Sequence, residues 1–146
     1  MKTRVEFRSA AFPPYDGEED EINPGVFGKR FAEFLVRGLS KKGFRPLKLS
    51  AEDWGWVIPI ENDGFRLWIG CANQDESPDG FSCFIEPHTP TIRKYLIFGR
   101  VDTSARVMAL QQAIDEILAA DPSIADKHWW SHEEYNGSES EPKRGT

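Results

Sequence analysis

Hydrophobic and polar residues alternate along several short segments of this chain, which is the pattern of half-buried β-strands. The first alternation covers Lys2–Arg8, where Val5 and Phe7 point to one side of the strand and the charged residues point to the other. Further along, the alternation predicts an antiparallel meander, whose first two strands are joined by the tight-turn sequence Asn62-Asp63-Gly64. The strands predicted for this meander span residues 54–60, 65–71, 81–86 and 93–98.

Two other segments repeat their apolar residues with the spacing of amphipathic helices. The first is predicted to begin at Asn23-Pro24, a good cap and first-turn pair, and to end before Gly43. The second is predicted to begin within Asp102-Thr103-Ser104 and to stop at Asp121-Pro122. The apolar stripes of the two helices contain Phe27, Phe31, Phe34, Leu35 and Leu39 in the first, and Val107, Leu110, Ile114, Ile117 and Leu118 in the second.

These elements predict an α+β fold. We expect a single antiparallel sheet of about five to six strands, with two amphipathic helices packed on one face, in the order β-α-β-β-β-β-α-(β). The last strand is expected around residues 128–130. Residues 1–135 are predicted to form one domain, and residues 136–146, which contain no apolar side chain, are predicted to form a flexible tail.

Charge and composition narrow the classes of partner. The net charge of -6 opposes the phosphate attraction on which most nucleic-acid-binding proteins depend, so no nucleic-acid partner is expected. No apolar run is long enough to cross a bilayer, so no membrane association is expected and the cytoplasm is the predicted location. An acidic surface would instead steer the protein toward a basic partner.

The sheet face that two helices leave uncovered is the main candidate for recognition. With Leu67 and Ile69 pointing inward, the opposite face receives an unusual set of aromatic and charged residues. They are Arg66, Trp68, Ser82, Phe84 and Glu86, with Val57 and Pro59 beside them. Aromatic side chains flanked by charges are typical of a binding surface, for a protein partner or for a homodimer. The alternative is that the acidic loop or the tail covers this face structurally.

Other combinations of reactive residues have ordinary structural explanations. Cys71 and Cys83 are predicted to lie opposite each other and to face the core as thiols, with a redox pair or a metal site as the alternative. His128 and His132 have a metal-ligand spacing without an HExxH order, so no metal and no cofactor is predicted. The acidic segment 16–21 is predicted to be a solvated loop, since it lacks the EF-hand pattern.

A second possible site lies at one end of the predicted sheet. Glu86 and His88 alternate to the same side, and Trp54 and Trp56 belong to the strand predicted over residues 54–60. If these four side chains converge, they form a small-molecule site or an enzyme site. Asp53 and Glu61 are further carboxylates near strand ends, for which pairing with arginine or water is the simpler interpretation.

Several longer segments resemble a group of small uncharacterised bacterial cytosolic proteins. The segments that carry the resemblance are Tyr15-Asp16-Gly17-Glu18-Glu19, Asn23-Pro24-Gly25, Glu52-Asp53-Trp54-Gly55-Trp56, Leu67-Trp68-Ile69-Gly70-Cys71, Phe84-Ile85-Glu86-Pro87-His88 and Asp102-Thr103-Ser104-Ala105-Arg106. The resemblance implies no activity. In its general build, that of a small acidic tryptophan-rich α+β protein, this chain is similar to the immunity proteins that neutralise bacterial toxins. The sequence therefore favours a non-enzymatic binding module, immunity-like or regulatory, over the alternative of a small-molecule binder or enzyme.

Overall fold

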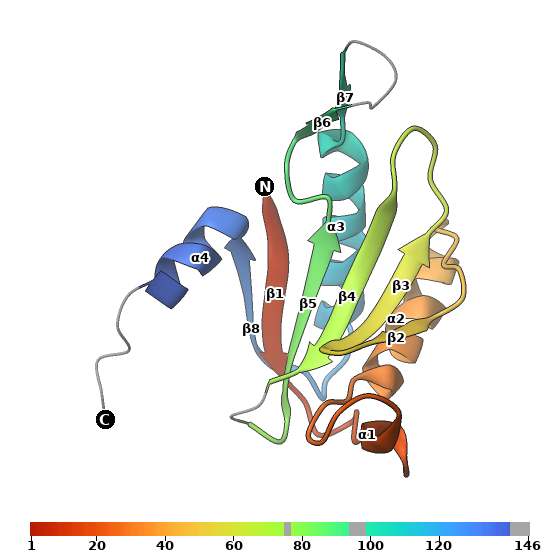
Figure 1. Ribbon diagram of the computed structural model, residues 1–146, viewed down its shortest axis with the longest axis vertical. Helices are drawn as coiled ribbons and strands as arrows, with labels where there is room; N and C mark the ends of the chain where they lie inside the picture. Colours follow the sequence, from red (N-terminus) through yellow and green to blue (C-terminus); the bar gives the residue numbers. More distant parts are fainter. Residues whose placement is uncertain (75–76, 94–98, 141–146) are drawn as a thin grey trace.

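The computed structural model describes residues 1–74, 77–93 and 99–140, and its centre is a six-stranded antiparallel sheet (Figure 1). The strands of this sheet are β1 (Lys2–Arg8), β2 (Ser50–Glu52), β3 (Gly55–Ile60), β4 (Leu67–Asn73), β5 (Gly80–Glu86) and β8 (Ala125–Ser131). Their spatial order is β2-β3-β4-β5-β1-β8, so the N-terminal strand lies between β5 and the C-terminal strand. Two short strands, β6 (Thr91–Arg93) and β7 (Arg100–Asp102), form a separate two-stranded sheet.

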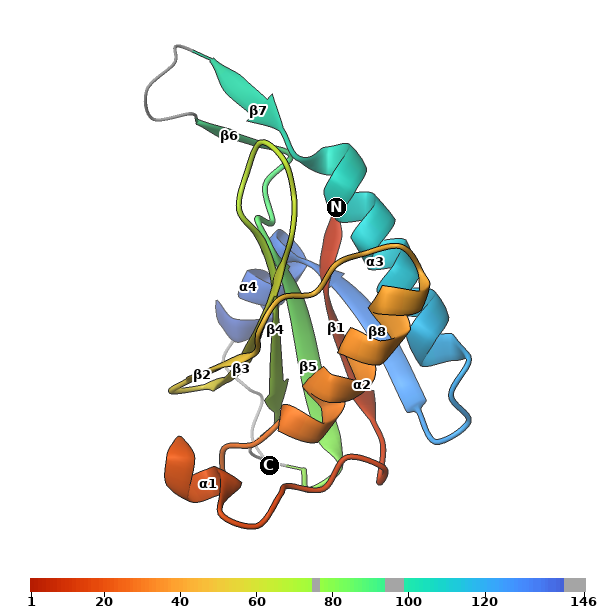
Figure 2. The ribbon, with the colours of Figure 1, turned by 90° about the vertical axis from the view of Figure 1, so that its right-hand side faces the viewer.

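Helices lie on both sides of the large sheet (Figure 2). The two long amphipathic helices, α2 (Lys29–Lys41) and α3 (Ser104–Ala119), cover one face. Helix α4 (His132–Ser140) lies on the opposite side, against β1 and β8, and α1 (Glu18–Glu21) is a single turn. The α+β class and the large antiparallel sheet are therefore as predicted, whereas the count of two helices and the exact element order are not matched.

The start of the first long helix corrects the sequence analysis. Asn23 does not cap it; its carbonyl accepts a hydrogen bond from the Val26 amide in a turn, and α2 begins five residues after Pro24, with Gly28 at the cap position. The physical reason is that the Glu18 carboxylate accepts hydrogen bonds from the amides of Gly28 and Lys29, at 2.8 and 2.9 Å. A carboxylate there satisfies helical N–H groups and complements the helix dipole.

The hydrophobic core lies between the sheet and helices α2 and α3. The register sets Ile69 opposite Ile85 and Cys71 opposite Cys83, and all four side chains are buried, as the alternation predicts. Phenylalanine rings fill the end of the core near the start of α2: Phe7, Phe12, Phe27, Phe31 and Phe81. This core leaves Trp68 and Phe84 on the other face of the sheet, where both are half-buried.

The ends of the chain bear on two further predictions. Residues 136–140, which the sequence assigns to a flexible tail, belong to α4, and residues 141–146 lie outside the described residues. The strand predicted over residues 93–98 begins where β6 ends, and its remainder, residues 94–98, is likewise outside the description. Within the described ranges, no helix is both long enough and apolar enough to cross a membrane.

Candidate functional site

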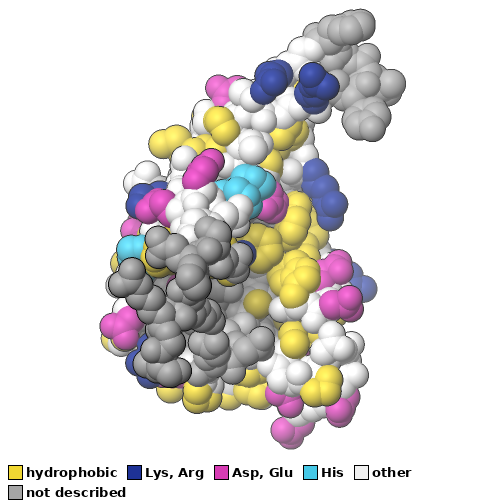
Figure 3. Space-filling view, turned by 60° about the vertical axis from the view of Figure 1, so that its left-hand side comes forward, with side chains coloured by type: hydrophobic (Ala, Val, Ile, Leu, Met, Phe, Trp, Pro, Cys, Tyr) yellow, Lys and Arg dark blue, Asp and Glu magenta, His cyan; other side chains and the backbone are white. Residues whose placement is uncertain are grey.

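Three aromatic rings form a cluster on the sheet face opposite α2 and α3. Trp54 comes from the turn between β2 and β3, Trp68 from β4 and Phe84 from β5. The ring centroids lie 5.1 Å apart for Trp54 and Phe84, 5.6 Å for Trp68 and Phe84, and 6.3 Å for Trp54 and Trp68. These distances are typical of favourable aromatic packing. We call these three residues the aromatic cluster. Figure 3 shows hydrophobic side chains gathered on this side of the molecule.

A glycine in β4 creates the seat for the central ring of the aromatic cluster. Gly70 pairs with Phe84, and a Cβ atom added at Gly70 would lie well inside contact distance of the Phe84 ring. The ring can therefore approach the β4 backbone closely. Trp54 then packs against the exposed side of this arrangement and keeps 38% of its surface accessible to solvent.

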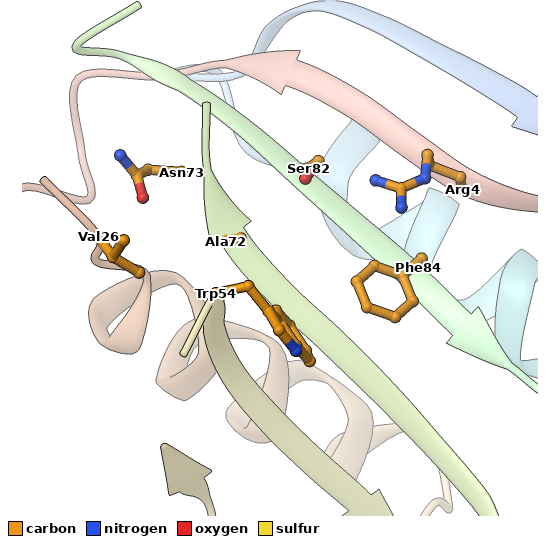
Figure 4. Close-up of a pocket in the computed structure, with 7 residues that line it drawn as sticks. All are labelled: Arg4, Val26, Trp54, Ala72, Asn73, Ser82 and Phe84. Carbon is orange, nitrogen blue, oxygen red and sulfur yellow. The ribbon is translucent and has the colours of Figure 1, made fainter. Parts of the chain in front are cut away.

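A hollow of about 380 Å³ lies beside the aromatic cluster (Figure 4). Its lining residues come from β1, β4, β5 and the two loops near them: Arg4, Val26, Trp54, Ala72, Asn73, Ser82 and Phe84. The Asn73 side chain is already engaged, because its Oδ1 accepts from the Phe27 amide and its Nδ2 donates to the Gly25 carbonyl. These bonds hold the loop that places Val26 at the rim. In the described part of the chain, the side-chain polar groups of the lining that have no hydrogen-bond partner include the Arg4 guanidinium, the Ser82 hydroxyl and the Trp54 indole N–H.

Arg4 is held in place by two aromatic rings. Its Cζ atom lies 4.9 Å from the centroid of the Phe84 ring and 4.0 Å from that of the Tyr135 ring of α4. Stacking of this kind uses the faces of the guanidinium and leaves its N–H groups, which point outward in the plane, to donate hydrogen bonds. In the described part of the chain, no carboxylate forms an ion pair with Arg4 and no acceptor takes a hydrogen bond from it.

Glu86 and His88 meet at the upper end of the same face. Both carboxylate oxygens of Glu86 lie within hydrogen-bonding distance of His88 Nδ1, at 3.1 and 3.0 Å. The His88 ring stacks on His132, the first residue of α4, with centroids 3.7 Å apart. This contact and the Arg4–Tyr135 contact fasten α4 to the sheet. Neither Glu86 nor His88 lines the hollow.

The remaining residues predicted for the site are placed apart from one another. Arg66 is exposed, with its guanidinium carbon 5.8 Å from the Trp68 ring centroid. Trp56 lies in the core beneath α2, and its indole N–H donates to Glu18 Oε2. The structure therefore brings Trp54, Trp68 and Phe84 together, pairs Glu86 with His88, and does not bring Trp56 to either group.

The two cysteines and the pair His128 and His132 do not form a reactive or metal-binding group in the described part of the chain. Cys71 and Cys83 are buried free thiols, and burial, followed by the contact with Cys83, raises the pKa of the Cys71 thiol well above its ordinary value. His128 is exposed and packs its ring edge-on against Trp130, away from His132. Over the described residues, no group of three or more potential ligands is placed to hold a metal ion.

Arg4 and Tyr135 are among the residues of the site region that were not identified from the sequence. Arg4 reaches the hollow because β1 pairs with β5, which sets Arg4 opposite Phe84 across eighty positions of sequence. Local alternation cannot reveal such a pairing. Tyr135 reaches Arg4 because α4 folds back over the sheet, and a signal for this helix was present. The segment Ser131-His132-Glu133-Glu134 fits the capping box, and Ser131 and Glu134 exchange the two expected hydrogen bonds.

Comparisons with protein-family models, with curated proteins and with solved structures yield no match for this chain.

Proposed function

We propose that this protein is a binding module that holds a partner protein against the aromatic cluster on its open sheet face. The observation that carries the proposal is the cluster itself: Trp54, Trp68 and Phe84 come from three separate elements and pack together on the side that α2 and α3 leave uncovered. An immunity-like or regulatory role is the form of this proposal in which binding blocks or adjusts the partner's activity.

The energetics favour a binding role for such a cluster. Apolar surface left in water costs about 25 cal/mol per Å², so a folding requirement alone would place large rings in the core. Tryptophan is also among the residues that contribute most to binding when they sit at the centre of an interface. The Gly70 seat and the packing of Trp54 on Phe84 fix the rings before a partner arrives, which reduces the entropy lost on binding.

The alternative, an enzyme or small-molecule site at Glu86 and His88, rests on the hydrogen bonds between these two side chains. Its weakness is geometric. Trp56 lies in the core, and the hollow is lined by other residues. The imidazole near His88 is that of His132, which stacks on the His88 ring and attaches α4 to the sheet. We therefore treat Glu86 and His88 as part of the attachment of α4.

The test begins with the purified full chain as bait in a lysate of the source organism, followed by reconstitution with the captured protein. Isothermal titration of that partner should give at least roughly tenfold weaker binding for Trp68→Ala and for Phe84→Ala. The matched control is Met108→Ala on α3, which removes a more exposed apolar side chain (57% accessible) on another surface and should leave the affinity unchanged.

Two further measurements test whether the cluster variants remain folded and whether the partner is a second copy of the chain. Thermal unfolding of the cluster variants should stay within about 1–2 kcal/mol of the parent, because both rings are half-buried and outside the core. Sedimentation of the protein alone shows whether the partner is a second copy, since a homodimer through this face would dissociate in the same two variants. Equal affinity of all variants for the partner would refute the proposal.

A further inference from the structure

The hollow beside the aromatic cluster contains a positioned cation that has no anionic partner among the described residues. Arg4 is clamped between the Phe84 and Tyr135 rings, and no carboxylate in the described residues pairs with it. Glu6, two positions along β1, faces the same side but forms no ion pair with Arg4 in the described chain and does not line the hollow. A charged donor held in this way is prepared for an acceptor that binding must supply.

Arg8, on the same strand, differs from Arg4 in its ion pairs. Arg8 lies four positions further along β1 and faces the same side of the sheet, but its guanidinium donates to both oxygens of Asp79, at 3.3 and 3.1 Å. Asp126 lies 3.9 Å away as a second counter-charge. Arg8 therefore has carboxylate partners, whereas Arg4 has none in the part of the chain that the structure describes.

The other walls define the rest of the ligand. Trp54 and Phe84 provide two aromatic surfaces, Ala72 provides a small apolar floor, and the Ser82 hydroxyl accepts no hydrogen bond and donates none in the described part of the chain. A volume of about 380 Å³ is at the small end of ligand pockets, which suits one aromatic or apolar group with one carboxylate.

We propose that this hollow is an anchor site for a carboxylate carried beside an aromatic or apolar side chain of the partner protein. The carboxylate accepts hydrogen bonds from Arg4 and Ser82, and the apolar group packs between Trp54 and Phe84. This inference rests on the proposed function. It is compatible with an overall negative charge, because net charge acts over long distances, whereas Arg4 acts on contact.

A fragment that mimics the anchor tests the inference without the partner. Sodium 3-phenylpropionate is titrated into the full-length, isotopically labelled protein and followed by amide chemical shifts. The neutral 3-phenylpropionamide has the same shape and is the matched ligand control. We expect saturable shifts at residues around the hollow, with a dissociation constant on the order of 1 mM for the acid and binding about tenfold weaker for the amide.

Variants locate the charge that is responsible. Arg4→Gln should weaken binding of the acid about tenfold and leave binding of the amide nearly unchanged. Ser82→Ala should produce a smaller loss and gives a second test if Arg4→Gln disturbs the fold. Arg8→Gln is the matched control, because it removes an arginine from the same strand and face but outside the hollow, and it should bind like the parent.

The outcomes separate this inference from the proposed function. Equal binding of acid and amide, or equal binding by Arg4→Gln and the parent, overturns the carboxylate anchor while leaving a cluster-dependent partner untouched. Selective binding of the acid combined with partner capture that ignores Trp68→Ala would retain the anchor chemistry and refute the protein-binding function.

Discussion

Trp56 and Glu18, separated by 38 positions in the sequence, are joined by a hydrogen bond in the interior: the indole Nε1 lies 2.9 Å from carboxylate Oε2. Glu18 is only 3% exposed, although it lies in a segment of four consecutive acidic residues. The same carboxylate also accepts from the amides of Tyr15, Gly28 and Lys29. One side chain thus joins the acidic turn, the start of α2 and strand β3.

Replacement of this carboxylate should destabilise the protein strongly. Glu18→Gln keeps the size of the side chain but turns an acceptor of four N–H groups into an amide with one acceptor oxygen and an NH₂ group that faces other donors. Hydrogen bonds to a charged group contribute about 1.5–3 kcal/mol each, so we expect a loss of roughly 2–4 kcal/mol in the free energy of unfolding. Chemical denaturation followed by tryptophan fluorescence measures it.

The neighbouring residue supplies the control for this prediction. Glu19 belongs to the same turn but is exposed, so Glu19→Gln should change the free energy of unfolding by less than about 0.5 kcal/mol. If both substitutions have the same small effect, Glu18 is not the residue that joins these elements.

The parts of the fold that the sequence predicted well depend on local geometry. Successive side chains of a strand point to opposite faces whatever the rest of the chain does, so alternation alone places Ile69 inward and Trp68 outward. The amphipathic stripe of α3 is local in the same way, and this helix begins within the predicted capping segment and ends before Pro122.

The failures arise where a turn or a distant partner decides the outcome. Trp54 and Trp56 were expected on one strand and one face, but β3 begins at Gly55 and Trp54 occupies the two-residue turn after Glu52. That turn contains no Asn-Gly or Asp-Gly signal. Glu18 resembles its exposed neighbours in sequence, and only the packed positions of Gly28 and Trp56 distinguish it.

A single methyl group in β4 should disturb the aromatic cluster without removing a ring. In Gly70→Ala the new Cβ collides with the Phe84 ring, which must leave its seat. We expect a stability loss of about 1–3 kcal/mol, a changed near-ultraviolet circular dichroism signal and weaker partner binding. Gly137→Ala is the control, since a Cβ there meets no atom of the described residues within 4 Å. An unchanged aromatic signal in Gly70→Ala would contradict the role assigned to this glycine.

The buried thiols should be inert in the native protein. Burial raises the pKa of the Cys71 thiol, so the reactive thiolate is scarce at neutral pH, and neither cysteine is accessible. An aromatic disulfide reagent at pH 7.5 should label no cysteine in the folded protein and both after denaturation. Rapid labelling of one native thiol would indicate that the strands β4 and β5 open readily.

The ring contact between His132 and His88 should contribute more to the attachment of α4 than the hydrogen bond between His132 and Asn136 does. His132→Ala removes the stacked ring at 3.7 Å, and we expect faster amide hydrogen exchange throughout α4 with little change in β4. His132→Asn, which retains a polar group near Asn136, should resemble the alanine variant. His128→Ala is the control, because His128 contacts Trp130 instead. Equal exchange in the His132 and His128 variants would remove the histidine stack from the attachment of α4.

Asp115 should make stability depend on pH in the acid range. Burial alone would raise the pKa of this carboxyl group, but hydrogen bonds from Lys127 and Trp129, at 2.6 and 2.8 Å, outweigh burial and lower the pKa below its ordinary value. A carboxylate with a lowered pKa in the folded state stabilises the protein above its unfolded pKa of about 3.9, and that contribution is lost as the pH falls through the folded value.

Asp115→Asn should therefore lower the free energy of unfolding at pH 7, with a difference from the parent that narrows below about pH 4. Urea titrations at pH 7, 4 and 2.5 measure this difference, and Lys127→Met should show the same narrowing because it removes one of the two donors. A difference that stays constant down to pH 2.5 would mean that Asp115 stabilises the fold through its shape and not through its charge.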